Sequence, residues 1–179
     1  KQFNFDLKDW RKNGDHIIVC GQNPNSEAWD LPDISAWWKN VITEIRKVSD
    51  RKIILRPHPR SPVNFKITDS NVEIQQPKFV GEYDKFNFEE SLQNAWAVVN
   101  HNSNPAIEAV LQGIPVFVGT SSLCYDVGNH DLSNIENPLM PDRTKWCNEI
   151  AYTEWTVNEI EEGLPLQRLV PKLKEILDD

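Results

Sequence analysis

The stretch Arg56-Pro57-His58-Pro59-Arg60 combines side chains that suit an anionic ligand. Arginine is well adapted to phosphate recognition, and His58 could donate a hydrogen bond to a phosphate or leaving-group oxygen, or transfer a proton. The two prolines restrict the loop before a ligand arrives, which lowers the entropic cost of binding. The stretch therefore predicts a phosphate site with His58 as the best catalytic candidate. The alternative is a rigid surface loop with exposed charge.

A second stretch, Asn102 to Glu108 (NSNPAIE), has the pattern of a turn that enters a helix. Proline in the first helical turn is favoured, and the free N–H groups of a helix N-terminus attract anions. Ser103 and Asn104 are compact donors beside that end, and Glu108 lies one turn further on, where its carboxylate could accept hydrogen bonds from a ribose. The alternative is that Ser103 or Asn104 is only the N-cap and Glu108 a solvated residue.

The segment that begins Gly21-Gln22 gives a weaker signal. It lacks the spacing of a dinucleotide fingerprint, and no Walker loop occurs in the chain. Gly21 permits close approach of the backbone to a ligand or to a neighbouring loop. Trp29, in the polar loop that follows, either packs in the interior or stacks on a base or sugar.

These residues must be positioned by secondary structure, and the hydrophobic pattern predicts an alternation of strands and helices. Short apolar runs bounded by turn residues predict buried strands, and apolar residues at helical spacing predict amphipathic helices. The predicted strands are His16–Cys20, Lys52–Leu55, Val72–Ile74, Ala97–Val99 and Val116–Val118. The predicted helices are Ile34–Val48, Phe88–Asn94, Pro105–Gln112, Asp142–Ala151, Thr156–Glu162 and Leu169–Leu177, with Gly163 and Pro165 separating the last two.

Alternating strands and helices predict an α/β fold with a single Rossmann-like, doubly wound parallel sheet. Ligands bind such sheets at the carboxyl ends of the strands, where all the polar loops described above would lie. We expect a lead-in over 1–14, a nucleotide-binding domain over 15–141 and a helical C-terminal tail over 142–179 that packs on the same domain. Because the sole methionine is Met140, the segment 1–14 could be the end of a missing upstream domain.

Composition narrows the classes of function. The net charge of −8 disfavours non-specific nucleic-acid binding, although Arg51, Lys52, Arg56 and Arg60 form a locally basic cluster. Three widely spaced cysteines without a CxxC pair predict cytosolic thiols rather than a disulfide framework or a zinc site. The four histidines lack paired metal-ligand spacing, so no metal is expected. No run is long and apolar enough to span a membrane and no export signal is evident, so we expect a cytoplasmic protein.

The RPHPR loop, followed by HNSNPAIEAVLQGIPVFVG, resembles the nucleotide-sugar-binding half of GT-B glycosyltransferases. The likeness is greatest to the capsule-polysaccharide and the sialyl- or Kdo-transferase-like branches, and the segment PDRTKWCNEIAYTEWTVNEIEEG is similar to putative glycosyltransferases of tailed phages. The resemblance covers roughly residues 15–163. It implies that Arg56 or Arg60, with His58, contacts the donor phosphate, that Ser103 and the following amides bind phosphate, and that Glu108 holds the ribose.

The resemblance thus predicts a glycosyltransferase donor domain that binds a nucleotide-activated sugar and stabilises the leaving phosphate. The acceptor would be a glycan or a modified DNA base, inside a bacterial host if the protein is phage-encoded. GT-B enzymes have two such domains, so this chain implies a missing upstream domain or a homodimer. Two alternatives stay open: a sugar-nucleotide epimerase-like enzyme and a non-catalytic nucleotide or phosphosugar-binding module. The predicted nucleotide-sugar-binding residues are Gly21, Gln22, Arg56, His58, Arg60, Asn102, Ser103, Asn104 and Glu108.

Overall fold

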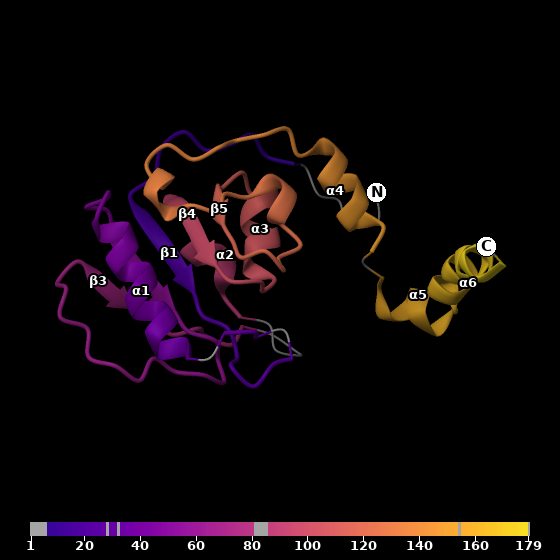
Figure 1. Ribbon diagram of the computed structural model, residues 1–179, viewed down its shortest axis with the longest axis horizontal. Coiled ribbons are helices and arrows are strands. Elements are labelled where there is room, and N and C mark those ends of the chain that lie inside the picture. The colour runs from indigo at the N-terminus through magenta and orange to yellow at the C-terminus, as the bar shows by residue number, and fades with distance from the viewer. Residues whose placement is uncertain (1–6, 28, 32, 81–85, 154, 179) are drawn as a thin grey trace. The chain divides into compact units, whose positions relative to one another are not determined.

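The computed structural model describes residues 7–27, 29–31, 33–80, 86–153 and 155–178. The chain divides into two compact units, residues 1–142 and residues 143–179 (Figure 1). The first unit contains all the strands of the sheet, and the second contains three helices. Whether the second unit packs on the first as a tail stays a prediction.

The first unit is an α/β structure built on one five-stranded, all-parallel sheet. The order β3-β2-β1-β4-β5 is compatible with a Rossmann-like fold. Connections lead from β1 through α1 to β2 in one direction and from β4 through α3 to β5 in the other, and α1 and α3 cover opposite faces (Figure 1). The strands are β1 His16–Cys20, β2 Lys52–Arg56, β3 Val72–Ile74, β4 Ala95–Asn100 and β5 Val116–Phe117.

Every predicted strand and helix is present; the bounds of β1 and β3 are as predicted, and those of the other elements are shifted. The α-helices are α1 Ile34–Arg46, α2 Phe88–Ser91, α3 Pro105–Leu111, α4 Thr144–Ala151, α5 Val157–Glu161 and α6 Leu164–Asp178. Two short 3₁₀ helices, η1 Tyr125–Val127 and η2 Leu132–Asn134, were not predicted. Helix α2 is shorter than expected, and β4 is longer because both its faces are buried.

The prediction for α6 was wrong at its start, because the helix begins at Leu164 rather than Leu169. Gly163, at φ +74°, does separate α5 from α6. Pro165 does not, because the first helical turn has no intrahelical use for the N–H group that proline lacks. Pro171 lies within the helix.

One cluster of the core lies between the sheet and α1. Ile17, Ile53 and Leu55 are fully buried on the sheet side, and α1 contributes Trp38 and Ile45. Alternation along a strand sends the next residues, such as Ile18 and Cys20, to the α3 face. These two buried faces explain why the strands read as continuous apolar runs.

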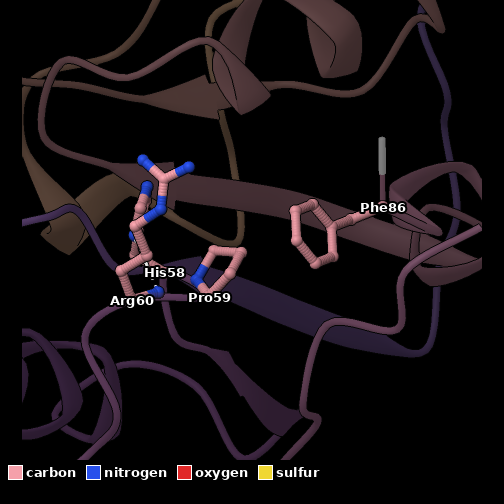
Figure 2. A pocket seen from close by; sticks show the side chains of 4 residues that line it. All are labelled: His58, Pro59, Arg60 and Phe86. Atoms are coloured by element: carbon pink, nitrogen blue, oxygen red, sulfur yellow. Dashed lines mark hydrogen bonds between the residues drawn. The ribbon is translucent and has the colours of Figure 1, made fainter. Parts of the chain in front are cut away.

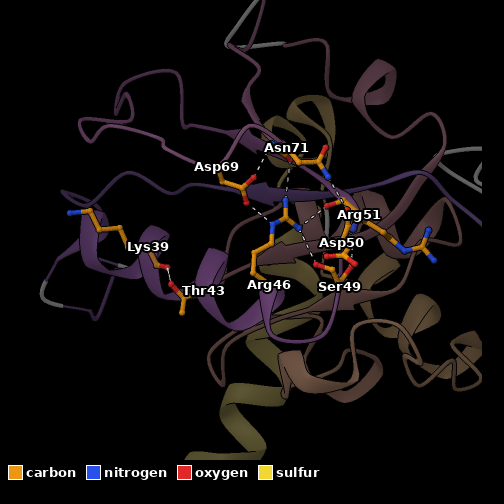
Figure 3. A network of polar contacts seen from close by, with 8 residues as sticks. All are labelled: Lys39, Thr43, Arg46, Ser49, Asp50, Arg51, Asp69 and Asn71. Carbon is orange, nitrogen blue, oxygen red and sulfur yellow. Dashed lines mark hydrogen bonds and ion pairs between the residues drawn. The ribbon is translucent and has the colours of Figure 1, made fainter.

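The amino edge of the sheet is held by a network of arginine side chains (Figure 3). Arg46 donates to Asp69 Oδ2 at 2.6 Å and to the carbonyl oxygens of Ser49, Arg51 and Asn71. Arg51 donates to both carboxylate oxygens of Glu136 at 2.9 to 3.1 Å, bonds the Gly14 carbonyl, and lies 4.6 Å from the centre of the Trp96 ring.

The basic cluster expected from Arg51, Lys52, Arg56 and Arg60 is therefore not one patch. Lys52 begins β2 and Arg56 ends it, so the first two residues lie at the amino edge and the last two at the carboxyl edge. A five-residue strand separates the two edges by roughly 16 Å. No helix in the described part of the chain is long and apolar enough to cross a membrane.

Candidate functional site

The polar loops predicted from the sequence all lie at the carboxyl edge of the sheet. Strands β1, β2 and β4 are adjacent and parallel, so the segments that start at Gly21, Pro57 and His101 leave the sheet on the same side. Between β1 and β4 the crossovers reverse direction, and a crevice at such a point is where open α/β sheets bind ligands. Gln22 and Asn102 follow the two strands that flank this switch point.

Gln22 places a buried side-chain oxygen at this edge of the sheet. Its exposed fraction is 5%, and its side-chain oxygen Oε1 has no hydrogen-bond partner among the described residues. A buried amide oxygen without a donor costs about 1–3 kcal/mol. The switch point therefore presents an acceptor that a hydroxyl or N–H group of a ligand could satisfy.

Gly21 makes room for a side chain of the core. A Cβ atom at this position would lie 2.4 Å from Cζ2 of Trp38, so the missing side chain accommodates a core residue of α1 rather than a neighbouring loop. Its role in ligand binding stays a prediction.

The last residues of three strands form a polar layer on the α3 face. Cys20 is in register with Arg56 on one side and with Asn100 on the other. Asn100, 2% exposed, donates to Ser103 Oγ at 2.6 Å and accepts from the Ser103 amide at 3.0 Å. This closed pair of bonds fixes the loop after β4, so the backbone position of Ser103 is set by a residue that the sequence did not single out.

Arg56 is a buried, hydrogen-bonded structural residue rather than an exposed cation. Its exposed fraction is 5%, and its guanidinium donates to Ser91 Oγ at 2.8 Å, Asn87 Oδ1 at 3.0 Å and Gln75 Oε1 at 3.3 Å. The ring of Phe88 lies 5.4 Å away. Burial lowers the pKa of Arg56, and the charge of Glu108 opposes that shift. This guanidinium joins β2 to the segment around α2.

Glu108 belongs to the same layer. Burial raises the pKa of its carboxyl above the ordinary value, Glu89 adds to the rise, and Arg56 opposes it. Burial likewise raises the pKa of Cys20 to about 12, which keeps the thiol protonated and unreactive. The ribose-binding role of Glu108 stays a prediction.

His58 and Arg60 remain at the surface of the β2 end. They line a half-open pocket of about 140 Å³ together with Pro59 and Phe86 (Figure 2). His58 Nδ1 accepts the Arg60 amide at 3.1 Å, so the neutral ring carries its hydrogen on Nε2 as a donor. The pocket is smaller than the 300–1,000 Å³ of complete ligand sites. Its size suits one group of a larger ligand.

At the start of α3, where the sequence predicts an anion site, backbone N–H groups already donate to carbonyl oxygens of the chain. The helix has seven residues, and its N-cap Asn104 makes no side-chain capping bond. The amide of Ala106 already donates to the Ser103 carbonyl, and those of Ile107 and Glu108 donate to the Asn104 carbonyl. Asn102 donates to Ser121 Oγ at 3.0 Å, which links the loops after β4 and β5.

His101 and Asp30 form a pair that the sequence did not reveal. The two side chains, far apart in sequence, meet at 2.5 Å between His101 Nε2 and Asp30 Oδ1. Trp29 packs edge-on against His101 at 5.3 Å and against Trp37 at 5.9 Å. Gly119 is required beside them, because a Cβ there would lie 2.7 Å from His101 Nδ1. The pair ties the loop after β1 to the end of β4.

Several residues of the site gave no signal in the sequence. Gln75 was the one that could have been found, because it directly follows β3 and so must lie at the carboxyl edge. The remainder come from loops or from α2, whose positions depend on the whole fold: Asp30, Phe86, Asn87 and Ser91. Among the described residues, no group of three or more histidine, cysteine or acidic side chains is arranged to hold a metal.

Comparison with known proteins does not assign a family. No protein-family model matches the chain, and no curated protein is significantly similar to it.

Proposed function

We propose that the chain is the donor-binding domain of a glycosyltransferase, with a nucleotide-activated sugar bound across the carboxyl edge of the sheet. The observation that carries the proposal is the buried Gln22 oxygen, without a partner among the described residues, at the topological switch point beside β1. The likeness of the RPHPR and HNSNPAIE segments to GT-B donor domains supplies the chemical class of the ligand.

The proposed site has an anion-binding end and a neutral end. His58 and Arg60 follow β2, whereas Asn102 and Ser103 follow β4. The ends of β2 and β4 are two strand spacings apart, roughly 10 Å, with β1 and Gln22 between them. That span suits a ligand that carries a phosphate at one end and hydroxyl or amide groups at the other.

Each residue then has a separate task. Arg60 and the Nε2–H of His58 bind the phosphate and stabilise its charge as the sugar–phosphate bond breaks. Gln22, Asn102 and Ser103 accept from or donate to the hydroxyl or amide groups. Arg56 holds the start of the loop after β2 in position, because its guanidinium donates to Ser91, Asn87 and Gln75.

The test is thermal stabilisation of the chain by CMP, UDP, GDP and ADP. One of them should raise the melting temperature, since a ligand at a hundred times its Kd adds about 2.7 kcal/mol to the free energy of unfolding. Arg60→Ala and His58→Ala should each weaken that nucleotide about tenfold or more, and Gln22→Leu should weaken the corresponding nucleotide-sugar. Lys52→Ala, at the opposite end of β2, is the matched control and should leave binding unchanged.

Three results would change the proposal. No stabilisation by any nucleotide would refute it. Stabilisation that survives the His58 and Arg60 substitutions unaltered would refute the site while keeping the ligand class. Binding of nucleotide-sugars with neither transfer nor hydrolysis, by the chain together with any catalytic partner domain, would favour the non-catalytic binding module.

A further inference from the structure

Helix α6, in the second unit, exposes a stripe of large apolar side chains. Leu177 is 82% exposed, Ile176 71% and Leu166 68%. In the sheet unit, by contrast, residues of the same types are fully buried in β1 and β2. The stripe consists of Leu166, Leu169, Val170, Leu173, Ile176 and Leu177.

The spacing of the stripe is that of a helix inside a bundle. Its members recur every three or four residues, so they share one face at 3.6 residues per turn. In heptad terms they occupy two successive sets of a, d and e positions, the pattern of a helix that packs against others. Pro171 lies on the opposite side of the helix, so its ring does not interrupt the stripe. Val157 and Ile160 of the contacting helix α5 are also exposed, at 70% and 58%.

The charges beside the stripe complement one another between copies. Lys172 and Lys174 border the stripe on its two sides, whereas α5 ends in the acidic pair Glu161 and Glu162. None of these four side chains forms an ion pair with a described residue of its own copy. A two-fold arrangement with antiparallel α6 helices brings each acidic pair toward the lysines of the other copy, in an isologous contact.

The apolar area is sufficient for a stable dimer. Burial of side chains of this size removes roughly 60 to 120 Å² each from water. Six of them on each copy amount to on the order of 1,000 Å², about the minimum for a specific protein–protein interface. The α5 residues Val157 and Ile160 add to it.

We infer that the α5–α6 helices form a homodimer interface, in which two copies pack their apolar stripes together as a four-helix arrangement. An anionic lipid surface is the competing occupant, because lysines flank the stripe. The acidic side chains of α5, including Glu159, Glu161 and Glu162, would be repelled by such a surface.

The test is the mass of the chain in solution, by sedimentation equilibrium over a range of concentrations. The wild-type chain should sediment as a dimer, and Leu173→Glu should raise the dissociation constant at least about tenfold, because a charge enters the apolar contact. Glu175→Lys, on the opposite side of α6, is the matched control and should stay dimeric. Circular dichroism should show that both variants keep their helix content, since Leu173 is 54% exposed in one copy.

A charge-reversal pair tests the arrangement itself. Lys172→Glu/Lys174→Glu and Glu161→Lys/Glu162→Lys should each weaken self-association, and an equimolar mixture of the two should recover a mixed dimer. A wild-type chain that stays monomeric at high concentration would overturn the inference. So would a monomer that co-sediments with phosphatidylglycerol-containing vesicles through the same stripe, which would assign α6 to a lipid surface.

Discussion

The two edges of the sheet use similar polar residues in different ways. At the amino edge, Arg46 is bonded to Asp69 and to backbone carbonyl oxygens (Figure 3), and Arg51 is bonded to Glu136 and to the Gly14 carbonyl. At the carboxyl edge, His58 and Arg60 line a half-open pocket and the buried Gln22 oxygen has no partner among the described residues. Under the proposed function, the first edge contributes stability and the second binds the ligand.

Arg56 is the exception that makes the comparison informative. It lies at the carboxyl edge, yet its guanidinium is bonded to three side-chain oxygens, as the arginines of the amino edge are bonded. Position at an edge therefore does not decide the role of an arginine, and burial separates the two at this edge: Arg56 is 5% exposed, whereas Arg60 lies exposed at the surface. Four substitutions test this distinction, from the largest expected effect to the smallest.

Arg51→Ala should lower the free energy of unfolding by about 2–3 kcal/mol, because charge-assisted hydrogen bonds to Glu136 and the contact with Trp96 are lost together. Urea denaturation measures this effect. Lys52→Ala, which removes an exposed ion pair with Glu73, should cost less than about 1 kcal/mol. If Arg51→Ala lowered the nucleotide affinity of the folded protein, the amino edge would contribute to ligand binding as well as to stability, which would contradict the comparison.

Arg56→Met should cost about 1–3 kcal/mol, because oxygens of Ser91, Asn87 and Gln75 lose their buried donor. Arg60→Met should change stability by less than about 0.5 kcal/mol, since Arg60 is exposed. Denaturation and nucleotide titration are compared for both variants. If Arg56→Met abolished binding without loss of stability, Arg56 would be a ligand contact.

Glu108→Gln should stabilise the protein by less than about 1 kcal/mol at neutral pH. The folded-state pKa of Glu108 is raised, so its favourable contribution is full below the unfolded-state pKa and is lost as pH rises through the folded-state pKa. The variant should therefore match the wild type in acid and exceed it at pH 7. Thermal denaturation at several pH values measures this. Lower stability of the variant at pH 7 would mean that the Arg56–Glu108 attraction outweighs burial.

Asp30→Asn should alter local opening but hardly change global stability, because Asp30 is exposed to solvent. The hydrogen bond from His101 lowers the pKa of Asp30, so this contact contributes above the unfolded-state pKa and is lost as pH falls through the folded-state pKa. The protection factors of the Trp29 and Gly119 amides against hydrogen exchange should fall across that acidic range in the wild type. In Asp30→Asn they should be low at every pH, and wild-type protection in the variant would contradict a stabilising contact between Asp30 and His101.

The sequence could predict those parts of the site that depend on local order along the chain. Residues that directly follow predicted strands, such as Gln22, His58 and Asn102, were found because parallel strands end at one edge. Side chains supplied by loops could not be found in this way. Asp30 meets His101 because of how the loop after β1 folds, and although His101 directly follows β4, nothing in the spacing marks Asp30 as its partner.

The sequence by itself determined the α/β alternation, the five strands and the edge at which the polar loops lie. Apolar periodicity and turn residues act over a few positions, so they survive without knowledge of the fold. Only the tertiary structure decided that Arg56 is buried and hydrogen-bonded, and that Gly21 accommodates Trp38. It also decided that the side-chain oxygen of Gln22 is enclosed without a hydrogen-bond partner among the described residues. Burial and the satisfaction of hydrogen bonds depend on residues distant in sequence, so only the fold shows that Arg56 is enclosed whereas Arg60 is exposed.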